Sequence, residues 1–253
     1  MEKSNHVKSV IKAFKIFENL VEDGSPMTLS SISNNLKINI STVHRLINTL
    51  VKLGYVEQDN KGLYKIGISA YNMADIVIKN FDLKKIVHPF IKEIVDKCNE
   101  TCNLVAFEDN QVVYLDQIES SNMVRMFAKE GSRGDAYCTG SGKALLANLP
   151  EKELKNYYQS INFKKYTVNT ITDANILKKE LNKIRKQGYA LDLEEKEIGV
   201  RCIAAPFFDG SGKLLGAISV SGPCSRITDD YLENTLIPLV RDTAIKITSK
   251  LNY

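Results

Sequence analysis

One polar stripe near the N-terminus carries side chains that could hydrogen-bond the bases of DNA. In "STVHRLINTLVKLG" (41–54), apolar residues from Val43 to Leu53 recur at helical spacing and predict a buried face. The opposite face is polar, and Arg, Asn and Thr are types that bond base edges in the major groove. Such a stripe is also typical of a plain solvated helix, so the prediction depends on its neighbours. The predicted base-contacting residues are Ser41, Thr42, Arg45, Asn48 and Thr49.

A second set of polar residues, in the C-terminal half, could hold a small carboxylate. In "TGSGKALL" (139–146) a Gly-rich turn opens a helix, so the N–H groups of Gly140 and Ser141 and the helix dipole favour an anion. In "AISVSG" (217–222), Ser219 and Ser221 share one face of a strand, because side chains alternate along it. Each feature alone is also a plain helix cap or a pair of strand serines. A binding pocket is nevertheless the best-supported chemistry of this half.

Catalytic motifs are incomplete. Histidines stand only at positions 6, 44 and 88, so a Ser/His/Asp or Cys/His arrangement in the C-terminal half lacks its base. "GSGKA" (140–144) fails as a P-loop, because Tyr137 stands where Gly is needed and Ala144 where Ser or Thr is needed. The run "DLEEKE" (192–197) offers paired carboxylates, but such runs are usually solvated loops. We expect no enzymatic activity and no cofactor.

The elements around the stripe favour DNA binding. Apolar spacing from Val7 to Val21 predicts a first helix, and a second follows over 29–36 with Thr28 as its N-cap. The third helix is predicted to start at Ser41 as N-cap and to end before Gly54 as C′. A hairpin over 55–66, turning at "DNKG", completes the order of a winged helix-turn-helix. Two hairpin residues could reach flanking phosphate: Lys61 and Lys65.

Helical patterns continue over 68–81, which we predict to be a linker helix, and over a further helix after Asp82, where Pro89 predicts a kink or a break. From Thr101 short β-rich runs dominate: 103–107, 111–118, 123–128, 188–193, 200–208 and 214–222. Helical patterns at 141–149, 174–188 and 229–251 interrupt or follow them. The second domain is therefore predicted to be α/β, with a mixed or antiparallel sheet.

Composition places the chain among globular proteins. Of its 253 residues, 43% are hydrophobic and 25% charged, and no run approaches the ~20 apolar residues of a membrane span. Residues 1–66 hold nine Lys/Arg against six Asp/Glu, a bias that suits a phosphate-contacting module. Five scattered cysteines argue against a disulfide framework, and Cys98 and Cys102, on a predicted helix, find no further ligands for a metal site. We expect a cytoplasmic protein without a metal.

Nearly the whole chain resembles the IclR family of bacterial transcriptional regulators. The resemblance lies in "SVIKAFKIFENL", "MTLSSISNNLKINISTVHRLINTLVKLGYVEQD", "YKIG", "CTGSGKALLA", "YALDLEEKEIGVRCIAAPFFDGSGKLLGAISVSGP" and "RIT", in the right order. It implies an α+β chain of two domains: a winged helix-turn-helix over 1–67 (helix-turn-helix 28–53, wing 55–66), a linker helix over 68–81 and a GAF-like effector-binding domain over 82–253. It also implies homodimers, commonly paired into tetramers, that bind palindromic operator DNA of catabolic operons.

The resemblance further implies an effector site. Gly140 and Ser141 match the backbone groups that hold an effector carboxylate. The polar contacts match Asp192, Cys202, Ser219 and Ser221, and the apolar wall matches Met123, Met126 and Val200. The chain departs from the family at Asp135, often Pro, and Tyr137, often His, which both flank the carboxylate-binding turn. It also departs at Lys37, commonly Gly, where we expect no loss of fold.

The sequence thus predicts a ligand-responsive DNA-binding regulator, a repressor, that senses a small organic or sugar acid. The alternative is a metabolite-binding or enzymatic α/β domain whose helix-turn-helix serves only assembly.

Overall fold

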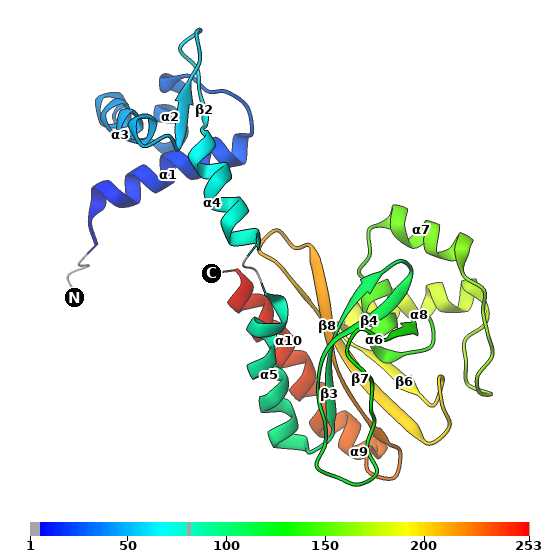
Figure 1. The fold of residues 1–253 in the computed structure, drawn as a ribbon. Coiled ribbons are helices and arrows are strands. Elements are labelled where there is room, and N and C mark those ends of the chain that lie inside the picture. The colour runs from blue at the N-terminus through cyan, green and yellow to red at the C-terminus, as the bar shows by residue number, and fades with distance from the viewer. Residues whose placement is uncertain (1–5, 80–81, 253) are drawn as a thin grey trace. The chain divides into compact units, whose positions relative to one another are not determined.

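The computed structural model describes residues 6–79 and 82–252, with the backbone alone for residues 75–79 (Figure 1). The chain divides into two compact units, Met1–Phe81 and Asp82–Tyr253, named here the N-terminal unit and the C-terminal unit.

The N-terminal unit has the predicted order of helix, helix, turn, helix and hairpin, so the expected winged helix-turn-helix is confirmed. Its hairpin is antiparallel, with Glu57 opposite Lys65, and Met27 forms an isolated bridge with Tyr64. The elements are α1 (Lys8–Asp23), α2 (Leu29–Leu36), α3 (Ile40–Lys52), β1 (Val56–Gln58), β2 (Tyr64–Ile66) and α4 (Ile68–Lys79). Their apolar faces meet in one core, whose buried residues are Ile16, Leu20, Met27, Ile32, Val43, Ile47, Val56 and Tyr64.

Helix caps fix where α2 and α3 begin. The Thr28 hydroxyl accepts a hydrogen bond from the Ser31 N–H at 3.1 Å and caps α2 as predicted. For α3 the prediction of Ser41 as N-cap is wrong. Asn39 caps this helix instead, because its Oδ1 accepts from the Ser41 N–H at 2.9 Å and the N-cap lies two residues earlier than predicted.

Left-handed residues close the same two helices. Gly54, at φ +77°, follows α3, and its N–H donates to the Val51 carbonyl while the Tyr55 N–H donates to that of Leu50. These two bonds form a Schellman motif, which favours the glycine predicted at C′. Lys37 closes α2 at φ 52°, so this turn takes a left-handed residue where the resemblance implies glycine. The predicted linker helix is seen as α4 as far as Lys79, and positions 80 and 81 lie outside the described residues.

An antiparallel sheet of six strands, in the order β5-β4-β3-β8-β7-β6, forms the centre of the C-terminal unit. The strands are β3 (Thr101–Glu108), β4 (Gln111–Ile118), β5 (Arg133–Asp135), β6 (Ala190–Leu193), β7 (Val200–Phe208) and β8 (Leu214–Pro223). The helices are α5 (Leu83–Cys98), α6 (Gly140–Leu146), α7 (Glu151–Ser160), α8 (Ala174–Gln187), α9 (Asp229–Tyr231), a π-helical turn (Leu232–Leu236) and α10 (Ile237–Leu251).

Helices cover both faces of this sheet (Figure 1). α5 and α10 pack on one face, where Ile91, Leu104 and Val240 belong to one buried cluster. α6, α7 and α8 pack on the other face, where Leu145 and Leu181 belong to a second buried cluster. The polar residues of the predicted pocket lie on the second face.

One predicted strand, over 123–128, is instead part of the connection between β4 and β5. The side chains of Val124 and Phe127 are exposed, and side chains rather than a neighbouring strand hold the backbone. Thr101 donates to the Met126 carbonyl at 2.9 Å, and Arg226 donates to the Val124 carbonyl at 2.9 Å. Residues 123–128 therefore do not form a strand of the sheet.

Three smaller predictions also change. α5 runs through Pro89 without a break, and Pro89 lies on the exposed side of the helix. Cys98 ends α5 whereas Cys102 lies in β3, so the two thiols do not share a helix. α7 was not expected, because Tyr157 is its one fully buried side chain and the run lacks a clear apolar stripe.

Candidate functional site

The predicted polar stripe of α3 faces solvent. Arg45 and Asn48 are exposed and Thr42 is half-buried, whereas Val43 and Ile47, on the opposite side of the helix, are fully buried. An amphipathic helix held by its apolar side presents its polar side at a fixed angle. The stripe can therefore enter a major groove as a unit.

Local hydrogen bonds engage several stripe residues. The Ser41 hydroxyl donates to Asn39 Oδ1 at 2.7 Å, and Asn48 Nδ2 lies 3.3 Å from His44 Nε2. The Thr49 hydroxyl donates back to the Arg45 carbonyl at 3.1 Å. Thr49 also lies at the edge of the stripe, beside an apolar hollow. The long Arg45 side chain consequently has the best reach toward a base edge.

Asp59 shapes the tip of the hairpin. Its Oδ1 accepts from the N–H groups of Lys61 and Leu63, each at 2.8 Å, and Gly62 takes φ +81° in the turn. This places Lys61 on the exposed tip. Lys65, one strand along, pairs with Glu57 at 3.2 Å, and exposed pairs of this kind are weak enough to exchange for a phosphate.

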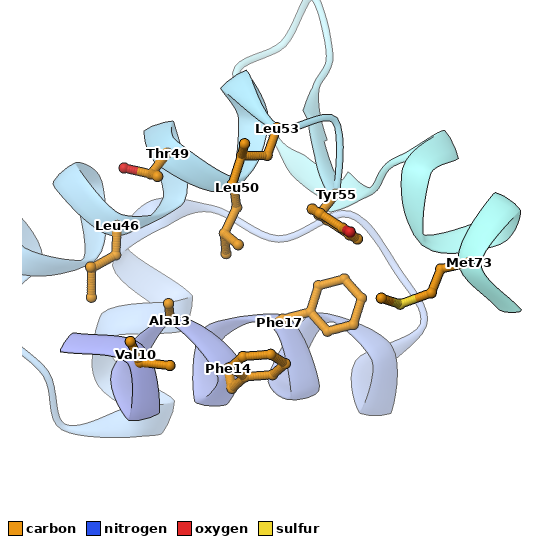
Figure 2. A pocket seen from close by; sticks show the side chains of 10 residues that line it. All are labelled: Val10, Ala13, Phe14, Phe17, Leu46, Thr49, Leu50, Leu53, Tyr55 and Met73. Atoms are coloured by element: carbon orange, nitrogen blue, oxygen red, sulfur yellow. The ribbon is translucent and has the colours of Figure 1, made fainter. Parts of the chain in front are cut away.

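An apolar hollow of about 320 Å³ lies on the N-terminal unit (Figure 2). Phe14 from α1, Leu53 after α3 and Met73 from α4 are exposed around it, by 62%, 58% and 56%. Its lining residues are Val10, Ala13, Phe14, Phe17, Leu46, Thr49, Leu50, Leu53, Tyr55 and Met73. Exposed apolar surface gathered in this way is typical of a protein–protein contact.

In the C-terminal unit, the sheet register brings the predicted polar contacts into two neighbouring rows. Asp192 of β6 pairs with Cys202 of β7, which pairs with Ser221 of β8, and directly opposed residues point to one face. Two residues along β8, Ser219 faces the same side, so four predicted contacts from three strands meet on the face covered by α6.

The start of α6 sits directly on these strands. A Cβ added to Gly140 would lie 3.1 Å from Cys202 Sγ and 3.5 Å from the Asp192 backbone nitrogen. A Cβ on Gly142 would lie 2.3 Å from the Cα atom of Ala136. The glycines of "TGSG" thus let the turn approach the sheet, and Gly140 and Ser141 join the polar rows as predicted neighbours.

Burial shifts the acid–base behaviour of this cluster. Burial raises the pKa of Asp192 to about 6, although hydrogen bonds from the backbone N–H groups of Glu195 and Lys196 oppose the shift. Burial also raises the pKa of Cys202 to about 11, opposed by hydrogen bonds from Ser221 and Ser219. Cys202 is therefore a neutral thiol, and Asp192 changes charge near pH 6.

The three residues predicted for the apolar wall differ in how far they are buried. Met126 and Val200 are half-buried, and Val200 starts β7 opposite Pro223. The Met123 side chain is 96% exposed in the β4–β5 connection, so the predicted place of Met123 in the wall does not hold here. An exposed thioether on a connection without sheet pairing has nothing to pack against.

Two site residues escaped the sequence analysis: Asn103 and Gln117. Asn103 is buried in β3 opposite Ser219, and Gln117 lies opposite it in β4. Asn103 Nδ2 donates to Ser219 Oγ at 3.4 Å, and Gln117 Nε2 donates to Asn103 Oδ1 at 2.7 Å. The signal was a single amide inside the apolar run "NLVAF", which could have marked an inward polar position.

The acidic run 192–197 does not form a pair of catalytic carboxylates. Glu195 is buried and forms an ion pair with Lys143 of α6. Glu194 accepts from the Gly199 N–H at 2.7 Å and shapes the turn before β7. These carboxylates therefore hold the connection between β6 and β7 over the start of α6.

The two departures beside the carboxylate-binding turn have structural partners. Asp135 Oδ2 accepts from Lys196 Nζ at 2.8 Å and from the Tyr166 hydroxyl at 2.5 Å. Tyr137 is buried, and its hydroxyl donates to the Lys164 carbonyl at 2.7 Å. Asp135 thus anchors Lys196 beside the site, whereas Tyr137 bonds to the segment around residue 164.

Two features are absent from residues 6–79 and 82–252. None of the helices there is long and apolar enough to cross a membrane. Within the same ranges, His, Cys, Asp and Glu do not gather in threes that could hold a metal ion.

Comparison with known proteins gives a consistent result along the chain. A model of the IclR helix-turn-helix domain matches residues 9–60, and a model of the bacterial transcriptional regulator IclR C-terminal domain matches residues 75–249. The HTH-type transcriptional repressor AllR of Salmonella typhi is 36% identical over 241 residues, which cover 95% of this chain and 88% of AllR.

Two solved structures are similar to this chain. Thermotoga maritima IclR has a TM-score of 0.65 and 33% identity, over 98% of this chain and 100% of that one. The PobR inducer-binding domain from Acinetobacter, a double mutant in complex with 3-hydroxybenzoic acid, has a TM-score of 0.62 and 27% identity, over 66% and 98%.

Proposed function

The chain belongs to the IclR family of bacterial transcriptional regulators, and we propose that it represses a catabolic operon and responds to a small organic or sugar acid. Its family and its relatives are regulators, not enzymes, so the alternative of an enzymatic α/β domain lacks support. Repression follows the function named for AllR. We place the regulator in the cytoplasm, together with its operator DNA.

Operator binding is assigned to α3 and the hairpin of the N-terminal unit. Arg45, Thr42 and Asn48 would meet base edges, with Ser41 and Thr49 beside them, and Lys61 and Lys65 would meet phosphates. A single module of this size reads few bases, so a two-fold dimer, or a pair of dimers, on a palindromic operator is the proposed assembly. The exposed apolar surface around the hollow of Figure 2 supports it.

Effector binding is assigned to the polar rows beneath the start of α6. The observation that carries this proposal is the meeting of Asp192, Cys202, Ser219 and Ser221 on one sheet face, directly under Gly140. The backbone of Gly140 and Ser141 would hold the carboxylate, and the side chains would hold the other polar atoms. A hydroxy or keto acid fits better than a dicarboxylate, because ionised Asp192 only accepts hydrogen bonds. The acid bound to the PobR domain is a hydroxy acid.

Two binding measurements, one with DNA and one with small carboxylates, test the proposed function. Fluorescence anisotropy with DNA from upstream of the protein's own gene should give saturable, sequence-specific binding. A thermal-shift screen of small carboxylates should find one that also weakens DNA binding. The coupling between the two sites is expected to be about 1–3 kcal/mol. Absence of specific DNA binding would refute the assignment of α3.

The double variant Ser219→Ala, Ser221→Ala tests the effector site separately. It should bind operator like the wild type but need a much higher effector concentration, because each lost hydrogen bond costs about 0.5–1.5 kcal/mol. Wild-type induction in this variant would place the pocket elsewhere. Loss of DNA binding without effector would make these serines structural.

A further inference from the structure

A chain of side-chain amides crosses the sheet and ends at Ser219. Directly opposed positions on β8, β3 and β4 are occupied by Ser219, Asn103 and Gln117, so all three side chains point to the same face. Ser219 and Asn103 are nearly fully buried, exposed by 1% and 3%. The row continues past Ser219 with Ala204 and Ala190, which belong to the buried cluster that also includes residues of α6.

A backbone donor fixes the direction of the hydrogen bonds that link these side-chain amides. The N–H of Ala128, in the β4–β5 connection, can only donate, and it meets Gln117 Oε1 at 3.3 Å. Gln117 must then turn its Nε2 toward Asn103, where Oδ1 accepts at 2.7 Å. Asn103 in turn presents Nδ2 to Ser219 Oγ at 3.4 Å. Every amide orientation follows from the first donor, because each amide has one donor end and one acceptor end.

The consequence for Ser219 is a fixed polarity. Its oxygen accepts from Asn103, so its proton remains to be donated. The nearby acceptor on the protein is the thiol sulfur of Cys202, a weak one. A ligand oxygen that accepts hydrogen bonds would be a better partner.

We propose that Asn103 and Gln117 are positioning residues of the effector site, which fix Ser219 as a hydrogen-bond donor and so select a carbonyl oxygen at that point, while Gly140 and Ser141 hold the carboxylate. This inference rests on the proposed effector site and adds its specificity. Ser219 requires an acceptor oxygen, whereas ionised Asp192 requires a hydroxyl donor. The proposed effector site therefore has a hydrogen-bond donor, Ser219, on one side and an acceptor, Asp192, on the other.

The substitution Gln117→Glu tests this polarity with almost no change in shape. One carboxylate oxygen still accepts from Ala128, but the other cannot donate to Asn103. The Asn103 amide then turns over, donates to the new carboxylate and presents Oδ1 to Ser219. The Ser219 hydroxyl then donates to Asn103 Oδ1, so Ser219 can only accept a hydrogen bond from the effector. Asn103→Asp should have the same effect, because an aspartate there accepts from both neighbours.

The measurement is calorimetric titration of the full-length protein with three 2-keto acids and their matched 2-hydroxy acids: pyruvate and lactate, 2-oxobutyrate and 2-hydroxybutyrate, 2-oxoglutarate and 2-hydroxyglutarate. For the pair that the wild type binds, Gln117→Glu should weaken the keto acid roughly three- to tenfold. The hydroxy acid, which donates to Asp192, should change much less. Asn182→Asp, on the exposed side of α8, adds the same charge and should change neither.

Coupling to Ser219 separates positioning from general damage. In a Ser219→Ala background, Gln117→Glu should weaken the keto acid no further, because the residue that it acts through is gone. Additive losses, or equal losses for keto and hydroxy acids, would overturn the inference while leaving the effector site intact. A wild type that binds none of these keto acids would overturn the acceptor selection at Ser219. If Ser219→Ala also leaves every effector response unchanged, the effector site itself fails. If Gln117→Glu does not fold, Asn103→Asp takes its place in each comparison.

Discussion

At the scale of single residues, burial in the sheet changes the acidity of Asp192. Its carboxyl group is buried, and burial raises the pKa to about 6. The folded protein therefore holds the Asp192 proton more tightly than the unfolded chain does. Between the ordinary pKa near 3.8 and about 6, a rise in pH ionises this group at the expense of the folded state.

Asp192→Asn should consequently stabilise the protein relative to wild type by an amount that grows with pH. The difference in free energy of unfolding should increase by up to about 3 kcal/mol between pH 3 and 7, at 1.36 kcal/mol per pKa unit. The asparagine oxygen can keep the hydrogen bond from the Glu195 N–H. Urea unfolding at several pH values measures the difference, since other carboxyl groups titrate in both proteins. A difference independent of pH would show that Asp192 has an ordinary pKa.

Truncation of Arg45 and truncation of Lys61 should weaken DNA binding in different ways. Arg45→Ala should cost about 1–3 kcal/mol of specific operator binding and relax the preference at one base position per half-site. Lys61→Ala, at the exposed hairpin tip, should weaken binding to all sequences alike and lower the salt slope by roughly one. Anisotropy at several salt concentrations, on operator and scrambled DNA, distinguishes them. An unchanged operator affinity for Arg45→Ala would contradict base contact by this stripe.

At the scale of elements, the position of α6 depends on a glycine. Gly142 lies so close to the backbone of Ala136 that an added Cβ would be 2.3 Å from its Cα and its carbonyl oxygen. Backbone atoms cannot yield as a flexible side chain can. The residue at position 142 thus decides how closely α6 approaches the strand region before it, and hence where Gly140 stands over Cys202.

Gly142→Ala should therefore destabilise the C-terminal unit by about 3 kcal/mol or more. The matched control is Gly188→Ala, at the end of α8, where φ is +79° and an added Cβ meets nothing within 4 Å. There the cost should be about 1–2 kcal/mol, from the left-handed backbone alone. Melting temperatures by circular dichroism rank the two variants. Equal losses would mean that α6 can move away from Ala136.

At the scale of the whole molecule, two units carry separate halves of the proposed function, and the exposed apolar surface belongs to the first. The rim of the hollow in Figure 2 includes Phe14 and Met73, which a monomer leaves in water. A second copy of the N-terminal unit, related by a two-fold axis, would cover the same surface on both copies.

Phe14→Ser should thus weaken self-association with little change in the stability of the N-terminal unit. Each buried Phe contributes about 1.5–3 kcal/mol, and a two-fold interface loses it twice. Val21→Ser is the control, since Val21 is also exposed on α1 but does not line the hollow. Sedimentation at micromolar concentration should show a dimer or tetramer for wild type and control, and smaller species for Phe14→Ser. A monomeric wild type would remove this proposal.

The sequence by itself determined the local elements and which of their faces are polar. Thr28 and Gly54 mark helix ends because capping is a contact between near neighbours. Period 3.6 exposes Arg45 and period two puts Ser219 and Ser221 on one side of a strand. These signals need only a few consecutive residues, so no tertiary contact is required to interpret them.

Only the tertiary structure decided which strands are neighbours and in what register. Asn103 and Ser219 are 116 positions apart, and their meeting depends on the pairing of β3 with β8. Met123 could not be placed because an apolar run on a connection has the same composition as a strand. Alternation specifies the side on which a residue lies but not its partner across the strands, because the partner is set by loop lengths and packing against α6.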